Sequence, residues 1–306
     1  MYCDSAFRAP WWLTSPVAQT LQGWRLRRHI GSATGWRTRA LDDSRCWLEI
    51  SPPGNGALLL LVPGLPWPHN AVDGIALALH RAGLAVAVLH SPALLASEHD
   101  VDCAVERLLR DHPSSLFGLC GLSLGGAVAL NWLAGQGARF TIQAAAAASP
   151  VLRPDLMAEQ LDSRRLSLLR RPLLRSWKEA VVRHYGRQLP RHLIARLQAI
   201  DSVERFNTLV GAPLHGHATA SSWYTHLACN QPRLAGIGCP TLVLQARDDP
   251  LTPHSSLPPK GTLSRYVTVE LSTQGGHLGF IEGGWPWRQR GWMEERLAHW
   301  FANRLR

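Results

Sequence analysis

A Gly-x-Ser-x-Gly turn at residues 121–125 constrains the fold of this chain more than any other feature. An apolar run that predicts a short buried strand over 115–120 leads into the turn, and a small-residue run that predicts a helix over 124–134 follows it. A serine on so tight a strand-to-helix turn has a strained backbone, and side chains two residues to either side would collide. Glycine at 121 and 125 removes those collisions. The arrangement predicts that Ser123 is a nucleophile, held where a strand ends.

A serine hydroxyl needs a base that removes its proton and an acid that orients the base, and both residue types follow later in the chain. A β-branched and leucine-rich run predicts a strand over 241–246, which ends in an acidic, proline-rich turn at 247–253. A second predicted strand, 266–271, leads to His277 on a glycine-flanked loop, where an imidazole has the freedom that a general base needs. We therefore predict a Ser-Asp-His triad whose members all follow strands.

Two neighbouring aspartates could supply the acid. Asp249 is the better candidate because it immediately precedes Pro250, which turns the chain away from the strand. Asp248 would then cap the turn or pair with an arginine.

The same chemistry requires two backbone N–H groups that stabilise an oxyanion. One follows the nucleophile, at Leu124. The other is expected after an earlier strand, and the apolar run 57–62 ends in Pro63-Gly64-Leu65. We predict that Leu65 and Leu124 form the oxyanion hole.

Three further segments carry a resemblance to a known family. Residues 9–21 contain Pro-Trp-Trp-Leu and Gln-Thr-Leu, residues 206–217 contain Ala-Pro-Leu-His-Gly, and residues 275–280 read Gly-Gly-His-Leu-Gly-Phe. In these segments the chain resembles the YheT-type, or embryogenesis-associated, branch of the α/β-hydrolases. The resemblance implies an α/β-hydrolase fold, hydrolysis of short- to medium-chain acyl esters, acylglycerol-like lipids or phospholipids, and no metal or organic cofactor. It also suggests that His215 touches the substrate or the base, although a packing role for His215 is equally compatible with the sequence.

The chain departs from that branch at two places. It has Pro63-Gly64 where the branch usually has His-Gly, a change that a backbone donor at Leu65 tolerates. After the next strand, residues 90–97 lack the arginine and glycines of the branch. We therefore expect the acyl or alcohol pocket to differ from that of the relatives.

Alternating strand and helix patterns predict an α/β fold with a doubly wound, mostly parallel sheet and an inserted helical cap. The alternation breaks at Ser149-Pro150, and no strand pattern returns before about Gly236. We predict a core formed by residues 1–149 and 237–306, with a cap at 150–236.

The cap contains a basic, leucine-rich stretch. It interleaves Arg164, Arg165, Arg170, Arg171 and Arg175 with Leu166, Leu168, Leu169, Leu173, Leu174 and Trp177. Such a stretch can rest on an anionic membrane surface as a peripheral contact. Alternatively, its leucines cover the site and its arginines face water. Pro172 favours two short helices over one.

Composition and charge bear on which partners the protein binds and in which compartment it resides. The net charge is +10, but the arginines are spread along the chain without an aromatic-basic recognition motif, so we predict no nucleic-acid partner. The six cysteines lack metal-ligand spacing and fit buried thiols in a reducing compartment. No signal-peptide pattern or membrane-spanning run is present, and we expect a cytoplasmic protein. The oligomeric state stays open.

These observations predict a serine hydrolase that cleaves carboxylic esters of small molecules or lipids through an acyl-enzyme. One alternative is an acyltransferase or thioesterase that uses the same triad. Another is a non-catalytic α/β-hydrolase fold that serves as a binding protein.

Overall fold

A nine-stranded sheet runs through the protein. The structure is a computed structural model and describes residues 1–28, 35–42, 45–67 and 71–305. The strand order is β1-β9-β8-β7-β6-β4-β5-β3-β2. The pairs β2–β3 and β3–β5 are antiparallel, and the other pairs of this sheet are parallel. The strands are β1 (Tyr2–Asp4), β2 (Arg37–Ala40), β3 (Trp47–Ile50), β4 (Ala57–Val62), β5 (Ala85–His90), β6 (Leu116–Leu122), β7 (Ala144–Ala148), β8 (Thr241–Ala246) and β9 (Val267–Ser272). This sheet confirms the predicted mostly parallel α/β architecture.

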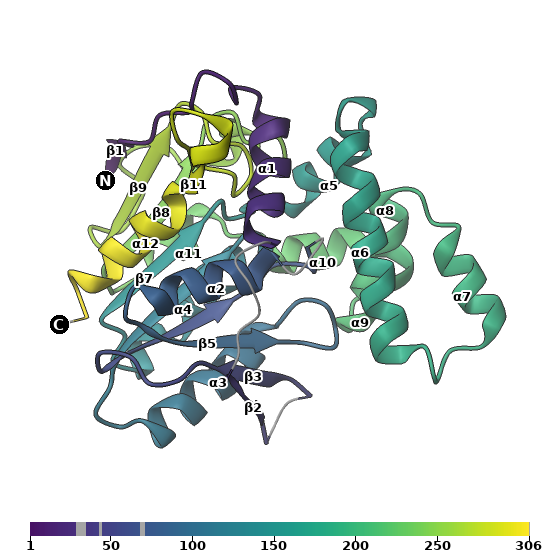
Figure 1. Ribbon diagram of the computed structural model, residues 1–306. Coiled ribbons are helices and arrows are strands. Elements are labelled where there is room, and N and C mark those ends of the chain that lie inside the picture. Colours follow the sequence, from purple (N-terminus) through teal and green to yellow (C-terminus); the bar gives the residue numbers. More distant parts are fainter. Residues whose placement is uncertain (29–34, 43–44, 68–70, 306) are drawn as a thin grey trace.

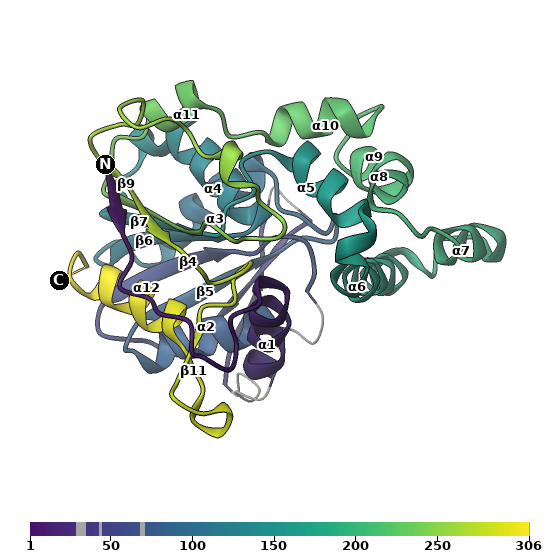
Figure 2. The ribbon, with the colours of Figure 1, turned by 90° about the horizontal axis from the view of Figure 1, so that it is seen from above.

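Helices cover both faces of the sheet. Figure 2 shows α1 (Pro16–Arg28), α2 (Ala71–Arg81) and α12 (Trp292–Ala302) on one face, with α3 (Glu98–Asp111) and α4 (Leu124–Gly135) on the other. Strands β4 and β8 are buried at every position because they are covered from both sides, which explains the continuous apolar sequence of β4. Helix α3 begins at a capping box formed by Ser97 and Asp100.

The chain between β7 and β8 forms helices only. In Figure 1, the helices α6 to α9 lie beside the sheet rather than on its faces, and α7 projects furthest from it. The helices of this segment are α5 (Pro154–Asp162), α6 (Ser167–Tyr185), α7 (Arg191–Gln198), α8 (Val203–Phe206), α9 (Ala212–Leu214), α10 (Ala220–Leu227) and α11 (Gln231–Ala235). We refer to residues 150–236 as the cap, and its boundaries stay a prediction. Among the described helices, none combines the length and the apolar character that crossing a membrane requires.

The prediction that Pro172 divides the basic stretch into two helices is wrong. Residue 172 lies inside the single 19-residue helix α6. A proline inside a helix costs about 3 kcal/mol. Leu169, Leu173 and Trp177 are buried on one face of α6, and burying such side chains contributes about 1.5–3 kcal/mol each. That burial outweighs the cost of the proline.

The burial of this stretch also bears on its two interpretations. Leu166, Leu169, Leu173 and Leu174 are buried, and Leu168 is exposed. Arg164, Arg165, Arg171 and Arg175 face water, whereas Arg170 donates to the carbonyl groups of Leu161 and Asp162. The stretch therefore turns its leucines inward, as in the second interpretation. Contact with a membrane surface stays a prediction, and it would depend on the charge of the water-facing arginines.

Close contact between the start of α4 and the end of β4 yields a matched pair of substitutions. A Cβ at Gly125 would collide with the carbonyl groups of Val62 and Pro63, whereas a Cβ at Gly135, in the same helix, would meet nothing within 4 Å. We expect Gly125→Ala to lower the free energy of unfolding by about 3 kcal/mol or more. Gly135→Ala should change it by less than about 1 kcal/mol. Urea denaturation followed by circular dichroism measures both, and equal stability of the two variants would contradict the close packing.

Candidate active site

Four parallel strands bring the predicted site residues to one end of the sheet, with β7 lying between β6 and β8. Ser123 follows β6, Asp249 follows β8, His277 follows β9, and Leu65 follows β4. Because parallel strands end at the same edge of a sheet, residues far apart in the sequence meet there.

The backbone of Ser123 has the strain that the sequence predicts. Its φ of 55° and ψ of −125° are rare for a residue with a side chain. Its amide donates to the Ala148 carbonyl at 3.0 Å, and its own carbonyl accepts from Gly126 at 2.9 Å and Val151 at 3.1 Å. A Cβ at Gly121 would lie 2.6 Å from the Cα of Gly126, so glycine is needed where the strand enters the turn.

Ser123, His277 and Asp249 form one hydrogen-bonded chain. The Ser123 Oγ lies 2.8 Å from His277 Nε2, and His277 Nδ1 lies 2.9 Å from Asp249 Oδ2 and 3.2 Å from Oδ1. All three residues are buried. A carboxylate at Nδ1 keeps the proton on that nitrogen and leaves Nε2 free to accept the serine proton.

The two aspartates have different surroundings. Asp249 also accepts from the amides of Leu251 and Thr252, at 2.8 and 3.0 Å, and from the side chain of Gln245 at 2.9 Å. These donors hold the carboxylate in place against the imidazole. Asp248 instead accepts from the amide of Gly276 at 3.0 Å, and burial raises the pKa of its carboxyl group. It thus tethers the histidine loop and does not face the imidazole.

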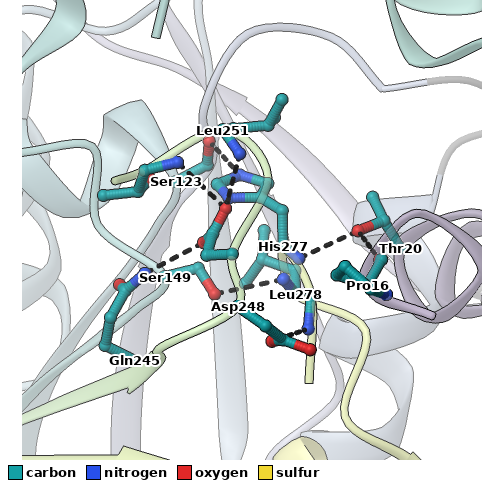
Figure 3. Close-up of polar contacts among 12 residues, drawn as sticks. Pro16, Thr20, Ser123, Ser149, Gln245, Asp248, Leu251, His277 and Leu278 are labelled. Atoms are coloured by element: carbon teal, nitrogen blue, oxygen red, sulfur yellow. Dashed lines mark hydrogen bonds and ion pairs between the residues drawn. The ribbon is translucent and has the colours of Figure 1, made fainter. Parts of the chain in front are cut away.

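Three side chains from three elements hold successive amides of the histidine loop (Figure 3). Asp248 accepts from Gly276, Thr20 of α1 accepts from His277 at 2.9 Å, and Ser149 accepts from Leu278 at 3.1 Å. Thr20 in turn donates to the Pro16 carbonyl at 2.8 Å. The imidazole is therefore positioned by its own backbone as well as by Asp249.

Helix α1 supplies most of the remaining support for this loop. The Gln19 side chain donates to the Ile281 carbonyl at 3.0 Å and accepts from the Ile281 amide at 2.8 Å. Arg27, fully buried and paired with Glu294 at 2.5 Å, donates to the carbonyl groups of Leu278 and Gly279. A Cβ at Gly276 would collide with the Pro16 carbonyl, so the loop touches the helix backbone. The sequence of residues 9–21 indicated only a family resemblance, and its role in supporting the histidine loop was not predicted.

The two predicted oxyanion donors lie on either side of a close contact. A Cβ at Gly64 would lie 3.2 Å from the Leu124 nitrogen and 3.1 Å from the Ser123 Cβ. The turn that carries Leu65 therefore packs directly on the serine turn. Neither the Leu65 nor the Leu124 amide donates a hydrogen bond to another described residue.

The space at the serine is small and mostly apolar. It measures about 10 Å³, which is about the volume that one water molecule needs. Its walls come from both the core and the cap: Trp24, Leu65, Trp67, Ser123, Leu124, Met157, Leu161, Leu173, Trp177, Leu251 and His277. An ester cannot enter unless some of these side chains move.

A larger, more polar cavity of about 300 Å³ lies on the other side of Trp67. Its walls include Gly64 and Trp67 from the oxyanion turn, Asp73 of α2, and His90 and Ser91. The last two belong to segment 90–97, where the chain departs from its branch. A pocket of this size is at the lower end of the range for small-molecule sites.

His215 lies apart from the serine. Its Nε2 is 3.1 Å from the Ala93 carbonyl, its ring stacks on Trp223 at 5.0 Å, and burial lowers its pKa. It lines a separate small cavity with His217 and His226. The structure does not bring His215 to the cavity at Ser123, and its contact with a substrate stays a prediction.

Comparisons with known proteins identify the family of the chain. A family profile described as serine aminopeptidase, S33, matches residues 87–284. The chain is 31% identical to YheT of Escherichia coli over 188 residues, which cover 60% of this chain and 54% of YheT. It is 26% identical to phospholipase ABHD3 of Homo sapiens over 274 residues, which cover 83% of this chain and 64% of the relative. The chain thus spans between about half and two thirds of the length of these curated relatives.

Solved structures confirm the fold. The crystal structure of carboxylesterase CesB from Bacillus subtilis aligns with a TM-score of 0.54 and 14% identity, covering 94% of this chain and 99% of that one. At 14% sequence identity, this structural match supports a shared fold and nothing further. Since the family profile covers more than half of the sequence, the chain belongs to the serine aminopeptidase S33 family of α/β-hydrolases.

Proposed function

We propose that this protein is a serine hydrolase that cleaves carboxylic esters, with Ser123 as nucleophile, His277 as general base and Asp249 as the acid that orients it. The observation that carries the proposal is the buried chain of contacts from Ser123 Oγ to His277 Nε2, at 2.8 Å, and from His277 Nδ1 to Asp249 Oδ2, at 2.9 Å. A nucleophile within hydrogen-bond reach of a base that a third group orients is the general signature of covalent catalysis.

The reaction follows from these positions. Ser123 Oγ attacks the ester carbonyl carbon while His277 Nε2 takes the hydroxyl proton, and the amides of Leu65 and Leu124 donate to the developing oxyanion. The bond to the alcohol oxygen breaks as His277 passes its proton to that oxygen. Water, deprotonated by His277, then attacks the acyl-enzyme and releases the carboxylic acid.

The substrate class rests on the cavity and on the relatives. The cap contributes Met157, Leu161 and Leu173 to the walls around the serine, which suits an acyl chain. One relative, phospholipase ABHD3, is named for action on a lipid ester. We infer short- to medium-chain acyl esters or acylglycerol-like lipids as substrates. Acyl transfer to an alcohol and thioester hydrolysis use the same triad, and a panel that includes both distinguishes them from ester hydrolysis.

Labelling tests the nucleophile. We expect a fluorophosphonate probe to add one label per folded wild-type molecule and none to Ser123→Ala, as measured by intact mass. Fluorophosphonates react with serines whose proton a neighbouring base can take. If folded wild-type protein takes no label, even from the smallest probe, the result would favour the alternative of a non-catalytic binding protein.

The two aspartates provide a matched test of the acid. Asp249→Asn should lower kcat by about 10³–10⁴-fold, because an amide at Nδ1 favours the wrong imidazole tautomer. Asp248→Asn should keep kcat within about tenfold, since its remaining carbonyl oxygen can still accept from the Gly276 amide. Ester hydrolysis by both variants at equal protein concentration is the measurement. A larger loss in Asp248→Asn would reverse the assignment.

Substitutions at Thr20 test whether helix α1 positions His277. Thr20→Val removes the oxygen that accepts from the His277 amide and leaves a buried donor unpaired, which costs about 1–3 kcal/mol. We expect a lower melting temperature and a lower kcat, with KM changed less. Thr20→Ser keeps the hydroxyl group and should recover most of both. If Thr20→Val, which keeps the methyl packing, retains the wild-type melting temperature and kcat, the hydrogen bond to the His277 amide does not position the base.

A further inference from the structure

Two buried tryptophans have indole N–H groups without an acceptor. Trp24 of α1 is 3% exposed and Trp177 of α6 is 2% exposed, and neither Nε1 has a hydrogen-bond partner among the residues that the structure describes. Two other buried indoles do have partners: Trp132 donates to Asp102 at 3.0 Å, and Trp300 donates to the Ala145 carbonyl at 2.9 Å. Leaving a buried donor unpaired costs about 1–3 kcal/mol, so each such group calls for an explanation.

Both unpaired indoles line the same space. Trp24 and Trp177 are walls of the cavity at Ser123, one from the core and one from the cap. The other described buried nitrogen without a partner, Nε of Arg170, belongs to a residue outside the walls of this cavity. The two residues with unpaired indole N–H groups thus both line the space next to Ser123.

The chemistry of an indole defines what would satisfy these donors. Indole N–H is a donor and never an acceptor, so the partner must be an oxygen or another acceptor atom. No described wall group pairs with the two indoles, and Met157, Leu161, Leu173 and Leu251 present hydrocarbon or thioether surface. The two predicted oxyanion amides already account for the scissile carbonyl oxygen. A substrate that satisfies the indoles must therefore bring a further acceptor oxygen.

We propose that Trp24 and Trp177 are specificity-determining residues that donate to a second oxygen of the substrate, close to the scissile ester. The inference rests on the proposed ester hydrolysis. Its preferred substrates carry an ether, hydroxyl or second ester oxygen near the reacting carbonyl, in either the acyl or the alcohol part. Plain alkyl esters leave the two donors unpaired in the complex and are poorer substrates.

Pairs of esters that differ by one methylene-to-oxygen replacement test this proposal. For the acyl part, p-nitrophenyl hexanoate is compared with p-nitrophenyl propoxyacetate. For the alcohol part, butyl hexanoate is compared with methoxyethyl hexanoate. Each ratio of kcat/KM is divided by the ratio of the hydroxide-catalysed rates, which removes differences in intrinsic reactivity.

We expect wild-type protein to favour the oxygen-bearing member of at least one pair by about three- to tenfold, the value of one hydrogen bond. Trp24→Phe or Trp177→Phe, which keep an aromatic ring but remove the donor, should bring that ratio close to one. Trp300→Phe is the matched control, because its indole donates to Ala145 outside the cavity, and it should keep the wild-type ratio. Either of the two cavity variants decides the test if the other does not fold.

Two results would overturn the proposal. One is a wild-type ratio near one for both pairs, and the other is a preference that both phenylalanine variants retain. Failure of the underlying ester hydrolysis would be recognised separately. In that case no ester of either pair is hydrolysed and fluorophosphonate does not label Ser123.

Discussion

The packing of the serine turn on the end of β4 is the constraint on which the site depends. The start of α4 comes so close to the end of β4 that a Cβ at Gly125 would collide with the carbonyl groups of Val62, the last residue of that strand, and of Pro63, which follows it. The same contact holds Ser123 at a positive φ and brings the Gly64 turn against the Leu124 nitrogen. One backbone contact therefore fixes the serine and both predicted oxyanion amides. Neither could be adjusted without moving the other, since each side of the contact is main chain.

The base, His277, follows a strand that does not adjoin the strand of the serine. His277 follows β9, which is separated from β6 by β8 and β7, so its loop must extend across the ends of two strands. Residues at those ends serve as supports: Asp248 and Asp249 after β8, and Ser149 after β7. Helix α1 holds the loop from the other side through Gln19, Thr20 and Arg27. The base is thereby held between the sheet and the N-terminal helix.

The sequence was sufficient for residues whose chemistry leaves a local pattern. The serine turn needs glycines at fixed spacing, and the acid and base stand where apolar strands end, so Ser123, Asp249 and His277 could be predicted together. Helix α1 could not be predicted from apolar periodicity, because it buries polar side chains, among them Gln19, Thr20 and Arg27. Their partners lie more than 250 residues away in the chain. The Pro172 prediction failed for a related reason, since burial of a whole helix face outweighed a local preference.

Closure of the cap and choice of substrate are linked in this arrangement. The space at Ser123 has room for about one water molecule, so a substrate must separate side chains of the cap from those of the core before it reaches the serine. Trp24 belongs to the core and Trp177 to the cap, and each presents an unpaired donor. A substrate oxygen that pairs with both would draw the two sides together again around the ester. Binding energy from that oxygen would then support the closed state in which water is excluded and the triad is complete. An ester without it would have to hold the cap closed through apolar contact alone.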